Sequence, residues 1–165
     1  MASEARIVIR GESQEDGEAI RALLNSAFGG SAESSLVDRL RESKELVLGL
    51  AAEADGQIVG YIALSALKSP ERALALAPVG VVPSHQRRGV GGKLIKEALK
   101  LARAEGWRMI FVLGEPEYYG RFGFTTQCAA RFDCEYAGPY FHALQLTEDP
   151  VAVDRVVYSE AFADL

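Results

Sequence analysis

The middle of the chain constrains the fold most, because an apolar run, an amphipathic segment and a second apolar run follow one another there. Residues 73–82 are almost continuously apolar, which is typical of a strand buried on both faces. In residues 90–105 the apolar side chains recur at helical spacing, and Gly106 is a favourable residue to end the helix. Residues 107–113 are again apolar. The short joints between these segments predict a right-handed strand–helix–strand unit with parallel strands.

A proline interrupts the first of these two strands. Pro78 has no N–H to donate to a ladder, so we expect a bulge or a break in pairing there. Further strands are expected at residues 6–10, 46–54, 57–66, 124–128, 141–146 and 153–158, and further helices before Phe28, over residues 34–42 and from Pro116. The whole chain, residues 1–165, is predicted to be a single α/β domain, and its pattern is weakest after residue 148.

The composition excludes several classes of protein. Hydrophobic residues make up 48% of the chain and charged residues 25%, as in a folded globular protein and unlike a disordered one. No apolar run reaches the roughly 18 residues of a transmembrane helix, and the first residues do not resemble a signal peptide. Cys128 and Cys134 fit neither a disulfide framework nor a zinc-binding pattern. We therefore expect reduced thiols, no metal and a cytoplasmic location.

The net charge of −5 is distributed unevenly along the chain. Residues 61–110 hold nine basic and three acidic side chains. By contrast, residues 1–60 hold six basic and eleven acidic side chains, and residues 111–165 hold three basic and nine acidic side chains. A compact anion such as a nucleotide diphosphate would find a basic region, while an extended nucleic acid would meet too much acidic surface. The simpler alternative is that the basic residues only form the solvent-exposed face of the long helix.

A segment rich in glycine and arginine joins the proline-containing strand to the long helix. Gly89, Gly91 and Gly92 lie at the expected helix start, after Arg87 and Arg88. The first turn of a helix has unpaired N–H groups and a partial positive charge, and glycines let a ligand approach them closely. These features predict a site for a phosphate or diphosphate group. The alternative is that the glycines only allow close packing of the helix on the strand.

Single positions exclude two better-known phosphate-binding loops. A Walker loop requires glycine where the chain has Arg87, and Ser or Thr where it has Leu94. A Rossmann fingerprint requires its third glycine at the position of Leu94 as well.

Two motifs resemble those of the GNAT superfamily of N-acetyltransferases. The pattern Gln86-x-x-Gly89-x-Gly91, after an apolar strand that ends in Val-x-Pro, is similar to the acetyl-CoA loop of that family. The later run Tyr118-Tyr119-Gly120-Arg121-Phe122-Gly123-Phe124 resembles its second signature, Tyr-x-x-x-Gly-Phe, and a bacterial subgroup of predicted N-acetyltransferases. The resemblance implies an α/β (α+β) GNAT-like fold, with a mixed, mostly antiparallel sheet, one central splayed parallel strand pair and flanking helices.

In this family the pantetheine arm of acetyl-CoA enters the gap between the two splayed strands. The cofactor-binding residues that the resemblance implies are Val79, Gly80, Val81, Gln86, Arg87, Arg88, Gly89, Val90, Gly91, Gly92, Lys93 and Tyr119. Main-chain groups of Val79 and Val81 would pair with the pantetheine, and the amides of residues 87–93 would hold the diphosphate.

The chemistry that the resemblance implies is acetyl transfer from a thioester to an amine. By family position, the amide of Val79 would donate to the oxyanion, and Tyr119 would act as the general acid for the leaving thiolate. Alternatively, Tyr119 has only a packing role, as one of two adjacent aromatic residues. In either case, we expect Tyr118 to lie in the core.

The family's usual position for the general base holds no carboxylate. Many relatives carry a glutamate four residues before Val79, where this chain has Ala75. Glu115 is the nearest alternative, acting through water, or it is only a charge at a helix end. His142 is either a further candidate or a structural histidine in a strand, and His85 is expected to contact the loop or a phosphate.

These expectations give one main hypothesis and one alternative. The main hypothesis is an N-acetyltransferase with acetyl-CoA as co-substrate, in which a primary amine of a small molecule or a protein attacks directly in a ternary complex. Acidic regions favour a cationic amine, and Tyr136, Tyr140 and Phe141 either line its pocket or are core or rim aromatics. The alternative is a non-catalytic acyl-CoA-binding sensor or regulatory module. No nucleic-acid or membrane partner is expected, and the choice between a monomer and a homodimer stays open.

Overall fold

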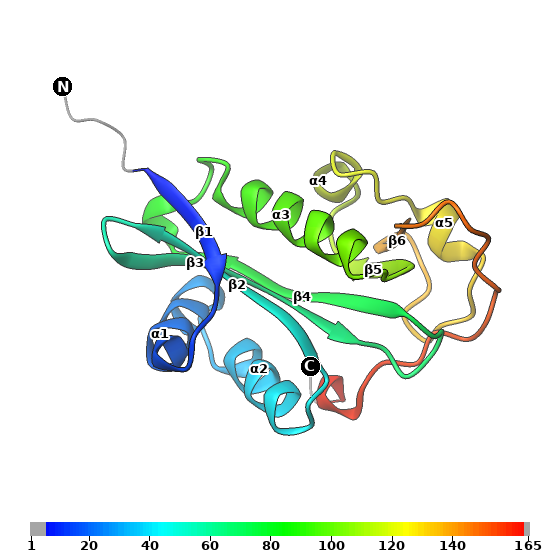
Figure 1. The fold of residues 1–165 in the computed structure, drawn as a ribbon, viewed down its shortest axis with the longest axis horizontal. Helices are drawn as coiled ribbons and strands as arrows, with labels where there is room; N and C mark the ends of the chain where they lie inside the picture. The colour runs from blue at the N-terminus through cyan, green and yellow to red at the C-terminus, as the bar shows by residue number, and fades with distance from the viewer. Residues whose placement is uncertain (1–5, 164–165) are drawn as a thin grey trace.

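The computed structural model describes residues 6–163, in which six strands form one sheet and five α-helices pack around it (Figure 1). The strands are β1 (Ile7–Gly11), β2 (Leu46–Ala54), β3 (Gln57–Ala66), β4 (Ala73–Val81), β5 (Met109–Leu113) and β6 (Phe141–Gln145). The helices are α1 (Gly17–Phe28), α2 (Ala32–Glu42), α3 (Val90–Ala104), α4 (Pro116–Gly120) and α5 (Thr126–Ala130). Neighbouring strands follow chain order and are antiparallel, apart from the parallel pair β4 and β5. The predicted mixed sheet with one parallel pair is confirmed.

Helices cover both faces of the sheet. In Figure 1, α1 and α2 lie on one side and α3 on the other. Successive residues of a strand point to opposite faces, so β3 contributes to both layers. Tyr61 belongs to the core cluster with Ile20 and Leu24 of α1, whereas Ile62 belongs to the cluster with Leu94 of α3. This arrangement explains why the sequence of β3 and β4 is apolar at nearly every position.

A bulge lies in β4 at the predicted place. Ile62 of β3 pairs with Val79, whereas Leu64, two residues further on, pairs with Leu76, three residues further back. Two residues of β4, one of which is Pro78, therefore face a single residue of β3. The expected disturbance of pairing at the proline is confirmed.

The parallel strands β4 and β5 pair along a short part of their length. The pairs run from Ala73 with Met109 to Ala75 with Phe111. Beyond that point, β4 continues to Val81 without pairing to β5. The two strands therefore diverge toward their C-terminal ends, as the prediction of a splayed pair requires.

Two of the predicted strands are wrong. Residues 124–128 lie largely in α5, because the Oγ1 atom of Thr125 accepts a hydrogen bond from the N–H of Cys128 at 3.0 Å and caps the helix. Residues 153–158 contain a single bridge, at Val157, and no strand. The other predicted elements are present, with some ends shifted by one to three residues.

Candidate functional site

The free edge of β4 offers main-chain groups to the gap between β4 and β5. Val82 donates its N–H to the carbonyl of Val59 on β3 at 2.9 Å. Because main-chain groups alternate in direction along a strand, those of Val81 and Val79 point away from β3, toward the side from which β5 has diverged. The carbonyl of Val81 accepts a hydrogen bond from the side-chain amide of Gln86 at 2.9 Å. The N–H and carbonyl of Val79 and the N–H of Val81 therefore face the gap.

The loop after β4 brings the start of α3 to the same gap. The loop passes through two left-handed residues, Arg87 with φ of +64° and Gly89 with φ of +80°. Gly89 is the N-cap of α3, and its carbonyl accepts a hydrogen bond from the N–H of Lys93 at 3.1 Å. The amides of residues 90–92 precede that bond and have no carbonyl within the helix to bind. These amides lie at the positive end of a helix of 15 residues, where negative charge is favoured, and are called the anion-binding seat.

A cleft of about 740 Å³ extends from the end of α1 past β4 to α3 and α4. Its lining residues are Ala27, Phe28, Val79, Gly80, Val81, His85, Gln86, Arg87, Gly89, Val90, Gly91, Gly92, Lys93, Lys96, Tyr118, Arg121 and Phe122. This lining includes two lysines and two arginines and no Asp or Glu among the residues described. The electrostatic environment therefore suits an anionic ligand.

Most of the residues that the family resemblance assigns to the cofactor line this cleft. They are Val79, Gly80, Val81, Gln86, Arg87, Gly89, Val90, Gly91, Gly92 and Lys93. Arg88 and Glu115 are exposed and lie outside the lining, and Tyr119 is buried next to it. The roles of all these residues toward a cofactor stay predictions.

The cleft also contains residues that the sequence did not assign to a cofactor. Phe28 comes from α1, which approaches β4 closely because Gly80 has no Cβ; a Cβ there would lie 3.0 Å from the Phe28 ring. The others are Ala27, Lys96, Tyr118, Arg121 and Phe122. The position of Lys96, three residues after Lys93, could have indicated a shared helix face, whereas nothing in the local pattern places α1 here.

The two adjacent tyrosines of α4 face different surroundings. Tyr118, which was expected in the core, is half-buried: it packs against the main core cluster and also lines the cleft, with its hydroxyl 2.7 Å from where a Cβ on Gly91 would lie. Tyr119 is 9% exposed, and its ring packs on Gly114 and against Phe124. Burial raises the pKa of Tyr119 to about 12, so its hydroxyl stays protonated at neutral pH.

The candidates for a general base are dispersed. Ala75 is 1% exposed in an apolar cluster, and Glu115 is exposed at the start of α4. His142 is buried, and its Nε2 atom donates to the carbonyl of Gly114 at 2.9 Å. His85 lines the cleft beside the loop. The described structure therefore brings none of the carboxylate candidates into the cleft lining.

The sequence matches the model of the acetyltransferase (GNAT) family over residues 17–124. The chain belongs to the GNAT family of acetyltransferases. Membership confirms the expected class of enzyme, an N-acyltransferase. This GNAT protein is 33% identical over 164 residues to the uncharacterized N-acetyltransferase YhbS of Escherichia coli strain K12, covering 94% of this chain and 98% of that protein. It is 37% identical over 135 residues to the uncharacterized N-acetyltransferase YjhQ of the same strain, covering 77% and 72%.

Two solved structures are similar over almost the entire chain. The crystal structure of E. coli YhbS in complex with CoA aligns with a TM-score of 0.90 at 32% identity, covering 99% of this chain and 95% of that chain. A GNAT family acetyltransferase from Brucella melitensis in complex with acetyl-CoA aligns with a TM-score of 0.82 at 35% identity, covering 96% and 99%. Both are GNAT proteins, in agreement with the predicted fold.

None of the helices within residues 6–163 has the length and apolar character needed to cross a bilayer. Over the same residues, no three His, Cys, Asp or Glu side chains gather in a way that could hold a metal ion.

Proposed function

We propose that this GNAT protein binds acetyl-CoA between β4 and β5 and transfers the acetyl group to a primary amine of a small molecule or a protein. The observation that carries the proposal is the divergence of β4 from β5 beside the free amides at the start of α3. The complexes of E. coli YhbS with CoA and of the B. melitensis protein with acetyl-CoA support the choice of ligand.

The geometry of the cleft fits an extended ligand with an amide-containing arm and a diphosphate. Val79 and Val81 pair with the amides of the pantetheine as if it were an added strand, because β5 does not occupy that side of β4. The amides of residues 90–92 and the side chain of Arg87 bind the diphosphate. Gln86 fixes the loop to the end of β4 through the carbonyl of Val81.

The chain's residues would assist a direct attack of the amine on the thioester carbonyl. A C–N bond forms, the C–S bond breaks, the amine loses one proton and the sulfur gains one. The N–H of Val79 donates to the developing oxyanion. Tyr119 donates a hydrogen bond to the leaving sulfur. The pKa of Tyr119, about 12, exceeds that of a thiol, so a phenolate left by proton transfer to the sulfur would be unfavourable. Tyr119 therefore gives its proton to the sulfur while it takes up the proton that the amine releases.

If Tyr119 donates to the leaving sulfur, the sulfur of acetyl-CoA must lie close to the Tyr119 hydroxyl. Tyr119 lies outside the cleft lining, with its ring on Gly114 just beyond the end of β5. The sulfur must therefore lie at the inner end of the gap, next to Gly114. Glu115 follows at once and is exposed, so through water it accepts the first proton, which a protonated amine must lose before it attacks; the second proton, released after the C–N bond forms, is the one that Tyr119 relays to the sulfur. Much of the rate enhancement then comes from holding the amine against the thioester.

A thiol-release assay tests the proposal. The protein is offered acetyl-CoA and a panel of amines, polyamines, amino acids and lysine peptides, and free thiol is measured. At least one amine should give release well above hydrolysis. Tyr119→Phe should lower kcat about 100-fold with little change in CoA affinity. Tyr158→Phe, at a tyrosine outside the cleft lining, should leave both unchanged.

Three outcomes would contradict these statements. Binding of acetyl-CoA without release for any amine would favour the alternative of a sensor or regulatory module. Equal losses of affinity and rate in Tyr119→Phe would remove its role in catalysis. A fall in rate between about pH 8 and pH 10 caused by ionisation of Tyr119 would contradict the raised pKa.

A further inference from the structure

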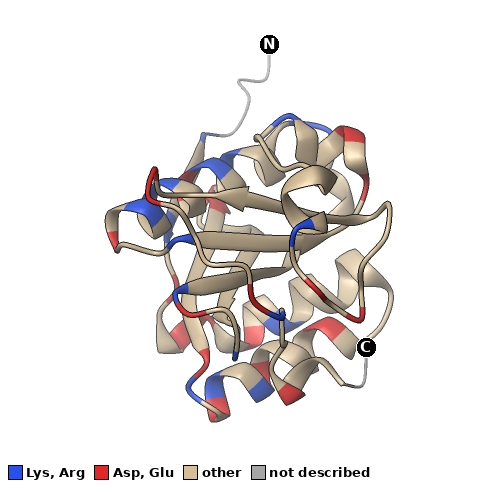
Figure 2. Ribbon diagram, turned by 90° about the vertical axis from the view of Figure 1, so that its right-hand side faces the viewer, with Lys and Arg blue, Asp and Glu red and all other residues tan. Residues whose placement is uncertain are grey.

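The cleft holds several cations that carry no partner charge. Within residues 6–163, none of the six ion pairs involves Arg87, Lys93, Lys96 or Arg121. In Figure 2, Asp and Glu residues are spread over the helices of the molecule, so carboxylates are abundant elsewhere. What distinguishes the cleft is that four cations line it together, with no Asp or Glu among the described lining residues.

Arg121 is held in place by the residues around it. Its Nε donates to the main-chain carbonyl of Tyr118 at 3.4 Å. Its guanidinium carbon lies 4.7 Å from the centre of the Tyr118 ring and 5.5 Å from that of Phe122. Its terminal nitrogens make no hydrogen bond to other described residues. The guanidinium is thus oriented in advance, with two N–H-bearing groups available for a ligand.

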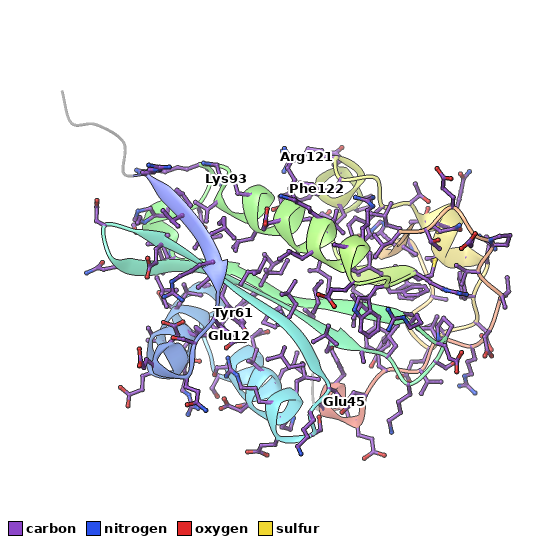
Figure 3. The ribbon with its side chains drawn as sticks, viewed as in Figure 1. Glu12, Glu45, Tyr61, Lys93, Arg121 and Phe122 are labelled. Carbon is purple, nitrogen blue, oxygen red and sulfur yellow. The ribbon has the colours of Figure 1, made fainter. Side chains whose placement is uncertain are left out.

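The position of Arg121 is fixed relative to α3 by aromatic packing. The Phe122 ring lies 3.6 Å from where a Cβ on Gly92 would be. Lys96 is one turn further along α3 from Gly92, and Lys93 is three residues before Lys96, so both lysines share this side of the helix. In Figure 3, Lys93 lies at the start of α3, and Arg121 and Phe122 lie beside each other near α4. Lys96 and Arg121 form a basic rim on the cleft, beside the amides at the helix start.

We propose that this basic rim, Lys96 and Arg121, binds the ribose 3′-phosphate of coenzyme A and makes the protein distinguish coenzyme A from dephospho-coenzyme A. The inference rests on the proposed cofactor. Coenzyme A carries two separate anionic groups, a diphosphate and a 3′-phosphate monoester. The amides of residues 90–92 and Arg87 accommodate the first, and the rim supplies charge for the second. A guanidinium suits a phosphate because its N–H groups can bind two oxygens at once.

Calorimetric titration with coenzyme A and dephospho-coenzyme A tests the assignment. The wild-type protein should bind coenzyme A about tenfold or more tightly, as expected for charge-assisted hydrogen bonds to one phosphate. Lys96→Gln and Arg121→Gln together should lower this ratio to about one to two, while the affinity for dephospho-coenzyme A changes less than about twofold. Lys100→Gln removes the same charge from α3 outside the cleft lining and should keep the wild-type ratio.

The two ligands separate the failure of this inference from that of the proposed function. If the wild-type protein binds neither ligand, both statements are refuted. If it binds both equally, or if the double variant keeps the ratio or weakens both ligands to the same extent, only the rim is refuted. Lys96→Gln alone, at an exposed helix position, gives the same comparison if the change at Arg121 prevents folding.

Discussion

Replacing Gly91 by alanine should weaken the binding of coenzyme A and leave the stability of the fold nearly unchanged. A Cβ on Gly91 would lie 2.7 Å from the hydroxyl of Tyr118, so the tyrosine must shift by a few tenths of an ångström. Because Cα–Cβ bonds in a helix tilt toward its N-terminus, the added methyl group also points toward the side of the unpaired amides. Losing one hydrogen bond to a charged phosphate costs about 1.5–3 kcal/mol, which is about a 10- to 150-fold loss of affinity for coenzyme A.

Stability should change little in the same variant. Alanine in a helix is more favourable than glycine by up to about 1 kcal/mol, and the displaced Tyr118 offsets part of that gain. The melting temperature should therefore stay within about 4 °C of wild type. Gly120→Ala is the matched control, because no atom lies within 4 Å of its Cβ position and it is outside the cleft lining. It should keep wild-type affinity.

Titration calorimetry and thermal unfolding on the same samples decide the matter. A Gly91→Ala protein that binds coenzyme A as tightly as wild type would refute the assignment of these amides to the diphosphate. A large fall in melting temperature would show that the glycine serves packing, either of α4 on α3 or, as the alternative raised by the sequence had it, of the helix on the strand.

Two further predictions concern the region around β1 and β2. A Cβ on Gly49 would overlap the partly buried carboxylate of Glu12, so Gly49→Ala should lower the free energy of unfolding by about 1–3 kcal/mol in urea, whereas Gly11→Ala, with open space around it, should not. The Arg10 guanidinium holds the pKa of Asp16 well below its usual range, so this pair stabilises the fold above about pH 4 and loses that effect as pH falls. The melting temperature of Asp16→Asn should depend less on pH between about 5 and 2; equal dependence would contradict the pairing.

Local patterns in the sequence were sufficient to predict the central unit. The apolar run of β4, the helical spacing of α3 and the apolar run of β5 are each features of consecutive residues. The spacing of the apolar residues, and the glycines and prolines that end each segment, were therefore enough to predict them. The bulge at Pro78 followed from the missing N–H alone. The glycines of the helix start likewise indicated free amides from the sequence alone.

Features that depend on distant segments could not be predicted in this way. Residues 124–128 are compatible with a strand, and the competing side-chain cap by Thr125 selects a helix. Phe28 reaches the cleft only because α1 packs against Gly80, some fifty residues later in the chain. Tyr118 and Phe122 pack on Gly91 and Gly92, and Arg121 lies over their rings, so these positions depend on α3 rather than on the local sequence pattern.

The pairing between β4 and β5 is the shortest in the described sheet. Strands β1–β4 and β5–β6 share backbone hydrogen bonds along residues 73–75 and 109–111, within the part of the chain described. A ligand that pairs with Val79 and Val81 would extend this junction beyond the point where the protein's own pairing ends. When this ligand is bound, strands β1–β4 and β5–β6 should open together rather than separately. Amide hydrogen exchange in β5 and β6 should then slow together with that in β4.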